Sequence, residues 1–146
     1  MGVVVDPLVA TQKAIFALLD GALTGATGAA VPVFDRVPSR TPDNNLPPEP
    51  PYAIVGDDDV IDDGGDDYRG EYVTANVHVW SRYGGRIEAA SIAGQVRALM
   101  SAELDDPDGR VRFVCWRYER TRILDDPDGV SKHAVVTFRY GTEPLI

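Results

Sequence analysis

The chain has 146 residues, 44% of them hydrophobic, and its 23 acidic and 14 basic side chains give a formal net charge of −9. This length suits a single domain with one core, and the charge argues against a protein that binds nucleic acid by neutralising its phosphates. No apolar run is long enough to cross a membrane, and the first residues lack the basic and apolar regions of a signal peptide. The lone Cys115 cannot form an internal disulfide, which favours synthesis inside a cell.

The first predicted element is a helix that begins at Asp6 and Pro7, because aspartate caps helices and proline is tolerated in the first turn. Apolar residues recur at helical spacing from Leu8 to Ala22. The stretch 21–30, rich in Gly, Ala and Thr, is interpreted as a flexible connector.

Two short strands are expected next, at 33–37 and 52–56. The proline-rich segment 38–51 between them cannot occupy a central position in a sheet, and it is either a mobile surface loop or a docking arm. Seven aspartates without a Lys or Arg among them then follow: Asp57, Asp58, Asp59, Asp62, Asp63, Asp66 and Asp67. We interpret the segment 57–67 as the mobile tip of a β-hairpin.

A strand and a helix predicted at 72–82 and 86–102 form the centre of the domain. The strand alternates with a period of two, Gly84 and Gly85 end it, and the helix carries one aliphatic stripe. Because the two apolar surfaces must cover each other, we expect one core. The residues predicted to be buried in it are Val73, Val77, Val79, Ile92, Val96, Leu99, Val136 and Phe138.

The hexapeptide Leu-Asp-Asp-Pro-Asp-Gly occurs at 104–109 and again at 124–129, and we interpret it as one turn used twice. Between and after the copies, strands are predicted at 111–124, with apolar residues on both faces, and at 132–140. The expected order is α-β-β-β-α-β-β. This order predicts an α+β fold, with two helices packed on a mainly antiparallel sheet, in a single domain over residues 1–146.

A search for catalytic chemistry finds no convincing site. A calcium-binding loop counted from Asp57 fails, because Ile61 and Tyr68 fall where ligands are needed. His78 and His133 could share a metal only if their strands were neighbours, and spacing indicates no third ligand, so we interpret them as histidines on the sheet surface. Cys115 is interpreted as a buried, inert thiol. We therefore predict no catalytic, cofactor-binding or metal-binding residues and no enzymatic activity.

Aromatic residues and arginines gather along two stretches of the sequence, and both types are enriched where proteins bury surface against partners. The alternative is that the arginine stems lie over the protein's own core. The candidate interface residues are Trp80, Tyr83, Arg86, Arg97, Trp116, Tyr118 and Arg120, with Arg117 and Arg122 in the same strip.

Several stretches in order resemble the tail completion, or tail terminator, family of long-tailed phages, prophages and gene transfer agents. They are Phe34-Asp-Arg-Val-Pro38, Val77-His-Val-Trp-Ser-Arg-Tyr83, Arg86-Ile-Glu88, Arg122-Ile-Leu-Asp-Asp-Pro-Asp-Gly129 and His133-Ala-Val-Val-Thr-Phe-Arg139. The resemblance spans residues 8 to about 142. The prolines between 42 and 51 and the aspartate-rich tip depart from the family pattern.

The resemblance implies a structural protein of the virion, made in the cytoplasm of a bacterial host. It implies a homohexameric ring that caps the head-proximal end of the tail tube, contacts the tail tube protein and a head-completion or neck protein, and lets DNA pass without specific binding. The acidic tips are then expected to face the lumen or its rim, with docking onto a basic partner surface as the alternative. Two other functions stay open: a head-closure or other neck ring protein, and a small metal- or ligand-binding domain that uses His78, His133 and the aspartates.

Overall fold

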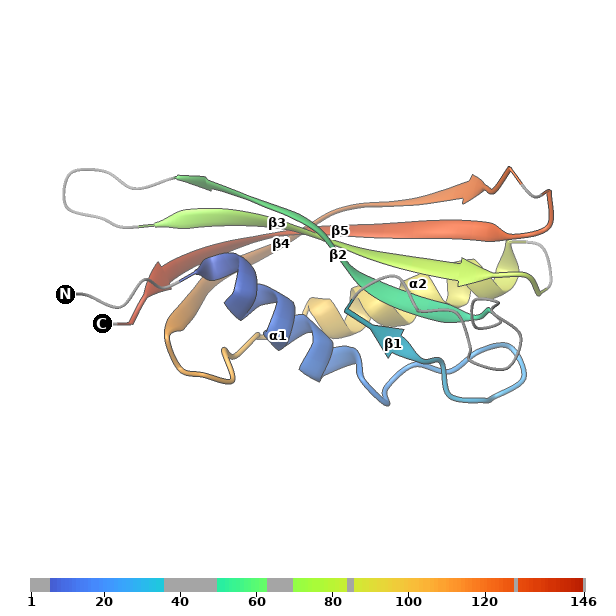
Figure 1. The fold of residues 1–146 in the computed structure, drawn as a ribbon, viewed down its shortest axis with the longest axis horizontal. Coiled ribbons are helices and arrows are strands. Elements are labelled where there is room, and N and C mark those ends of the chain that lie inside the picture. The colour runs from blue at the N-terminus through green and yellow to red at the C-terminus, as the bar shows by residue number, and fades with distance from the viewer. Residues whose placement is uncertain (1–5, 36–49, 63–69, 84–85, 128, 146) are drawn as a thin grey trace, which may run out of the picture.

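A computed structural model describes residues 6–35, 50–62, 70–83, 86–127 and 129–145 (Figure 1). Its elements are α1 (Pro7–Leu19), β1 (Val33–Phe34), β2 (Tyr52–Asp62), β3 (Glu71–Ser81), α2 (Ile87–Met100), β4 (Val111–Asp125) and β5 (Lys132–Pro144). The predicted order α-β-β-β-α-β-β and the α+β class are confirmed. Neither of the described helices is long and apolar enough to cross a membrane.

The strands form one sheet in the order β1-β2-β3-β5-β4. Every pair of neighbours is antiparallel except β1 and β2, which are parallel. Both helices lie against the same face of this sheet (Figure 1). The core is therefore the single layer between the helices and that face.

The central strands and α2 form the core as the alternation predicts. Val73, Val77 and Val79 of β3 are fully buried, and so are Ile92 and Val96 of α2. Val136 and Phe138 of β5 are buried as well. Leu99 is a correction, because it is only half-buried and packs against the core from the edge of the helical stripe.

The start of α1 follows the capping prediction. The Asp6 carboxylate accepts a hydrogen bond from the Leu8 amide at 2.9 Å, and Pro7 occupies the first turn. The connector after α1 differs from the prediction. Thr24 and Ala30 form a β-bridge, and the Gly25 amide donates to the Ala29 carbonyl at 2.9 Å. The stretch is therefore a hydrogen-bonded turn rather than the flexible connector that its composition suggested.

Strand β2 is longer than predicted, because it continues through the first aspartates to Asp62, which pairs with Glu71. The register shifts between Gly56 and Asp59, so a bulge lies where the aspartates begin. From Asp59 to Asp62 the strand pairs with β3 whatever charge its side chains carry. The rest of the predicted tip, with Asp63, Asp66 and Asp67, and the proline-rich segment up to residue 49 lie outside the described residues.

Strand β4 carries apolar residues as predicted, but it forms an outer edge of the sheet and is largely exposed, with Val114 40% and Trp116 38% accessible. One prediction for this strand is wrong. Cys115 is exposed rather than buried. Val111 and Phe113, at the start of the strand, are buried, and Tyr118 and Ile123 pack against the core while only partly buried. The physical reason is position, because an edge strand has one strand neighbour and the helices cover little of it.

The two isoleucines of α2 test the position of the core. Ile92 is 0% exposed and Ile87 is 76% exposed. Replacing Ile92 with Ala should lower the free energy of unfolding by about 2–5 kcal/mol, from lost transfer energy and the cavity left behind. The same replacement at Ile87 should change it by less than about 0.5 kcal/mol. Urea unfolding checks both, and equal losses at the two positions would contradict this placement of the core.

Candidate functional site

Polar and aromatic side chains gather on the face of the sheet that is turned away from the helices. We call it the open face, and none of the described helices covers it (Figure 1). On β3, the buried residues alternate with half-buried ones that point to this side. The open-face residues of β3 and β5 are Tyr72, Thr74, Asn76, His78, Trp80, His133, Val135, Thr137 and Arg139.

Three rings form a stack on the open face. The His133 ring lies 3.9 Å from that of Trp80, centroid to centroid, with 9° between their planes, and 5.0 Å from that of His78. His78 Nδ1 and His133 Nε2 are 2.8 Å apart, in a hydrogen bond. The strands of the two histidines are thus neighbours, as a shared metal would require. The two nitrogens nevertheless bond to each other, and no group of three potential metal ligands occurs in the described part of the chain.

A row of arginines follows β4 along the edge of the open face. Arg117, Arg120 and Arg122 are exposed, and no ion pair joins any of them to another described residue. We call these three the arginine row. Arg117 lies directly opposite Arg139 of β5, and the Arg139 guanidinium stacks 4.2 Å from the centre of the Tyr72 ring. Like charges directly opposite each other destabilise a strand pair. An anionic partner that bound at this edge would therefore reduce the repulsion between Arg117 and Arg139.

The other candidate interface residues do not share one surface. The Arg97 guanidinium of α2 lies 3.7 Å from the centre of the Tyr118 ring, and that ring also packs edge-on against Phe138 of the core. Arg97 and Tyr118 therefore hold α2 against β4 within one chain. This contact fits the second interpretation of these residues, in which an arginine stem lies over the protein's own core rather than in an interface. Trp116 pairs with Tyr140 on the helix side, whereas Arg120 pairs with Thr137 on the open face.

Tyr83 and Arg86 lie near the end of β3 and the start of α2. Tyr83 is 59% exposed, and the side chain of Arg86 is 63% exposed and forms a long ion pair of 3.5 Å with Asp125. This region is separate from the arginine row, although the sequence suggested one kind of surface for both. The candidate interface residues are therefore spread over several surfaces, because those on β4 alternate between the two faces of the sheet and the others lie on different elements.

The two copies of the repeated hexapeptide bracket β4. In each copy, the Gly amide donates a hydrogen bond of 3.0 Å to the carbonyl of the second Asp, three residues earlier. The bonds run from Gly109 to Asp106 and from Gly129 to Asp126. Gly109 and Gly129 have positive φ angles of 66° and 75°, which glycine adopts without strain. The prediction of one turn used twice is confirmed. The two turns hold both ends of the strand that carries the arginine row.

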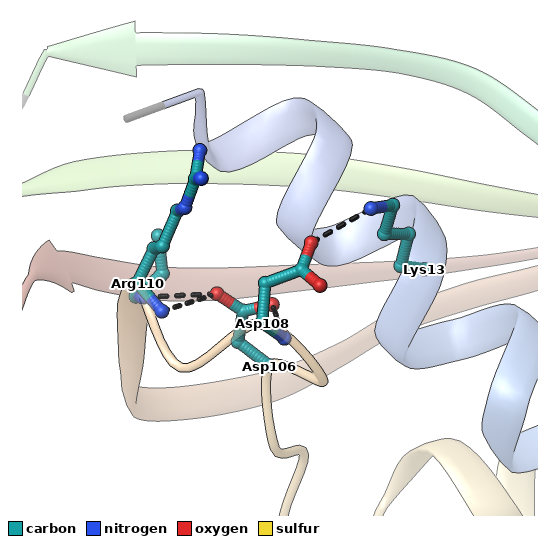
Figure 2. Close-up of polar contacts among 5 residues, drawn as sticks. Lys13, Asp106, Asp108 and Arg110 are labelled. Carbon is teal, nitrogen blue, oxygen red and sulfur yellow. Dashed lines mark hydrogen bonds and ion pairs between the residues drawn. The ribbon is translucent and has the colours of Figure 1, made fainter. Parts of the chain in front are cut away.

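The first of these turns is also tied to α1. The Asp106 carboxylate accepts hydrogen bonds from the amides of Asp108, Arg110 and Val111 at 2.8–3.0 Å, and Lys13 pairs with Asp108 at 2.7 Å (Figure 2). The hydrogen bond and charge of Lys13 lower the pKa of Asp108.

At the second turn, the hydrogen bond and charge of Lys132 and the charge of Arg86 lower the pKa of Asp125. Each end of β4 thus lies beside a carboxylate with a basic partner, and Arg112 pairs with Glu143, whereas the three arginines of the arginine row have no ion-pair partner among the described residues.

One buried carboxylate, which the sequence analysis did not single out, ties three segments together. Glu88 of α2 is 3% exposed and accepts hydrogen bonds from the Ser81 hydroxyl at 2.6 Å and from the Ala26 amide at 2.8 Å. A Cβ atom at Gly25 would lie 3.1 Å from the same carboxylate, which explains the small residue there. The only sequence signal was a Glu in the first turn of a helix, where a carboxylate is also common at an exposed position.

Comparison with known proteins adds to this geometry. Residues 13–143 match the family described as tail completion protein gp17. The tail completion protein gp17 of Bacillus phage SPP1 is 29% identical over 92 residues, which cover 62% of this chain and 66% of that protein, slightly under two thirds of its length. A chain in the virion of a native gene transfer agent particle shares the fold, with a TM-score of 0.73 and 22% identity over 93% of this chain and 96% of that chain.

The Glu88 network can be tested by substitution. Glu88→Ala should lower the free energy of unfolding by about 1–3 kcal/mol, because the Ala26 amide loses its acceptor. Glu88→Gln should recover much of that loss, since the amide oxygen can accept from Ala26 while its nitrogen donates to the Ser81 hydroxyl. Glu103→Ala, at an exposed position, is the matched control in urea unfolding. A loss at Glu88 no larger than at Glu103 would show that the network does not stabilise the fold.

The Lys13–Asp108 pair makes stability depend on pH. The pKa of Asp108 is lowered below its ordinary value of 3.8, so the pair stabilises the folded chain above that pH, and its contribution is lost as the pH falls through the lowered pKa. Asp108→Asn should therefore be less stable than the unmodified chain at about pH 7 and should approach its stability at about pH 3. Asp105→Asn, which removes an exposed carboxylate from the same turn, is the control. A difference between Asp108→Asn and the unmodified chain that is constant with pH would contradict the assignment.

Proposed function

Because this chain belongs to the family of tail completion proteins described as gp17, we propose that it forms a homohexameric ring at the head-proximal end of a phage or phage-like tail. The ring ends the tail tube and joins it to the neck. Its partners are other copies of itself, the tail tube protein and a head-completion or neck protein. DNA passes through its lumen without specific binding.

The observation that carries this proposal is the match to the family over residues 13–143, nearly the whole chain. The described residues agree with a structural role, because their conspicuous features are surfaces rather than a catalytic constellation. The described residues leave the open face, the arginine row and the exposed edge strand β4 uncovered. An assembled particle offers partners for such surfaces.

The two alternatives make different demands on the structure. A head-closure or other neck ring protein would use the same kind of surfaces, so only the binding partner separates it from the leading proposal. A metal-binding domain would need ligands that converge on one point. Among the described residues, His78 and His133 direct two nitrogens at each other across 2.8 Å, and no third potential ligand groups with them.

The proposal is tested with a tail tube protein from the same genome. When that protein polymerises in the presence of the chain, electron microscopy should show shorter tubes with one ring at one end. Addition of matching heads should then give joined particles. Without the chain, the tubes should grow to uncontrolled lengths and fail to join.

Two results would contradict the proposal. The tubes could keep the same length and bare ends with the chain present, or the chain could bind only the head portal side, which would favour the neck protein. Measurement of bound metal in the purified chain addresses the remaining alternative, because stoichiometric metal that is lost in His133→Ala would favour a metal-binding domain.

A further inference from the structure

The two edges of the sheet have different neighbours and different charge. Strand β4 pairs only with β5, so its outer edge has no strand beside it among the described residues. At the other side of the sheet, β1 pairs with β2 only at Ala53 and Ile54. From Val55 to Asp62, the outer edge of β2 likewise has no strand beside it in the part of the chain that is described.

The edge formed by β4 is basic. The arginine row lies there with Arg139 beside it, and no ion pair within the described residues neutralises the row. The one acidic residue between these arginines, Glu119, falls at the register shift between Tyr118 and Arg120 and has no partner opposite it in the ladder. Arg120 and Arg122 are two residues apart and therefore lie on one face. The register shift between Tyr118 and Arg120 puts Arg117 on the same face, so the three charges add to one positive surface.

The edge formed by β2 is acidic. Four of the six residues at positions 57–62 are aspartates, the segment contains no Lys or Arg, and Asp59 is exposed. Ile61 in the same segment is 53% exposed, and Val114 and Trp116 on β4 are also exposed. Both edges thus combine charge with apolar side chains, the composition that a protein interface buries.

The opposite charges lie at the same level of the sheet. The registers place Asp59 beside Thr74, Thr74 beside Arg139, and Arg139 beside Arg117. One row across the sheet therefore begins with an aspartate at the β2 edge and ends with an arginine at the β4 edge. If copies are related by rotation about an axis along the strands, Asp59 of one copy comes level with Arg117 of the next.

We propose that the arginine row of each copy docks against the β2 edge at Asp59 in a second copy of this chain. The contact uses two different surfaces, so it is head-to-tail and can continue around a closed ring. Side chains rather than a shared ladder make it, because β4 is bulged at Phe113/Cys115 and at Tyr118/Arg120, and bulges and charges prevent regular strand addition. This inference rests on the proposed function, since it specifies the contact by which the ring closes.

The test exchanges charges between the two edges. Arg117→Glu alone and Asp59→Arg alone should each lower the fraction of chain in rings by about tenfold, because each places like charges in the contact. An equal mixture of the two variants should form rings again. In an alternating ring, Glu at 117 meets Arg at 59 in one contact, and the original Arg and Asp meet in the next. The chain that carries both changes should also form rings on its own.

Arg110→Glu is the matched control, because it makes the same change of charge at an exposed position outside the arginine row. Native mass spectrometry of the chain gives the ring fraction, and electron microscopy of capped tubes gives it if rings form only on the tube. Circular dichroism confirms that each variant is folded. Raising the salt concentration should weaken the ring of the unmodified chain, because exposed charges are screened.

The outcomes separate this contact from the proposed function. If the unmodified chain forms rings and Arg117→Glu does so equally, the contact is wrong while the ring stands. If Arg117→Glu keeps the ring but slows DNA passage, and Asp59→Arg does not correct the defect, the arginine row meets phosphate instead, which also overturns the contact. If the unmodified chain forms no ring either alone or on tubes, both proposals fail.

Discussion

The structure depends on one imbalance, which is that two helices cover only one face of a five-stranded sheet. Burial of Val73, Val77 and Val79 beneath the helices stabilises that face through removal of apolar surface from water. The residues between them on β3 must then lie on the side without helices. The open face, with its stacked rings and arginines, is the necessary counterpart of the core and follows from the same alternation.

The sequence predicted the elements that this burial dictates. Strands β3 and β5 and helix α2 showed clear periods because each places its apolar residues on one side. The two strands lie inside the sheet and the helix packs on one of its faces. The exposed edge position of β4 could not be predicted, because apolar residues such as Val114 and Trp116 look the same whether they are covered or at an edge. The length of β2 was misread because Asp59 is unfavourable in a strand by propensity, whereas pairing with β3 decides its conformation.

The candidate site was predicted in composition but not in arrangement. Arginines and aromatic residues did mark exposed positions, yet Arg97 and Tyr118 pack on each other, while Arg120 lies on the opposite side of the same strand. Local sequence could not show that Arg117 and Arg139 are cross-strand neighbours, because that contact depends on register. Glu88 was missed for a similar reason, since its partners Ser81 and Ala26 come together only in the folded chain.

The strand order also has a consequence for how the chain folds. The hairpins β2–β3 and β4–β5 join segments that are close in sequence, whereas β3 meets β5 across an intervening helix and strand, as the Trp80–His133 pair shows. Closing that long loop costs entropy before its contacts form, so we expect the hairpins to appear early and their joining to limit the folding rate. Until the hairpins join, the backbone edges of β3 and β5 are unpaired and the valines of β3 are exposed, so both strands can pair with other chains. Nascent chains at high concentration are therefore most prone to aggregate through the strands that end up deepest in the protein.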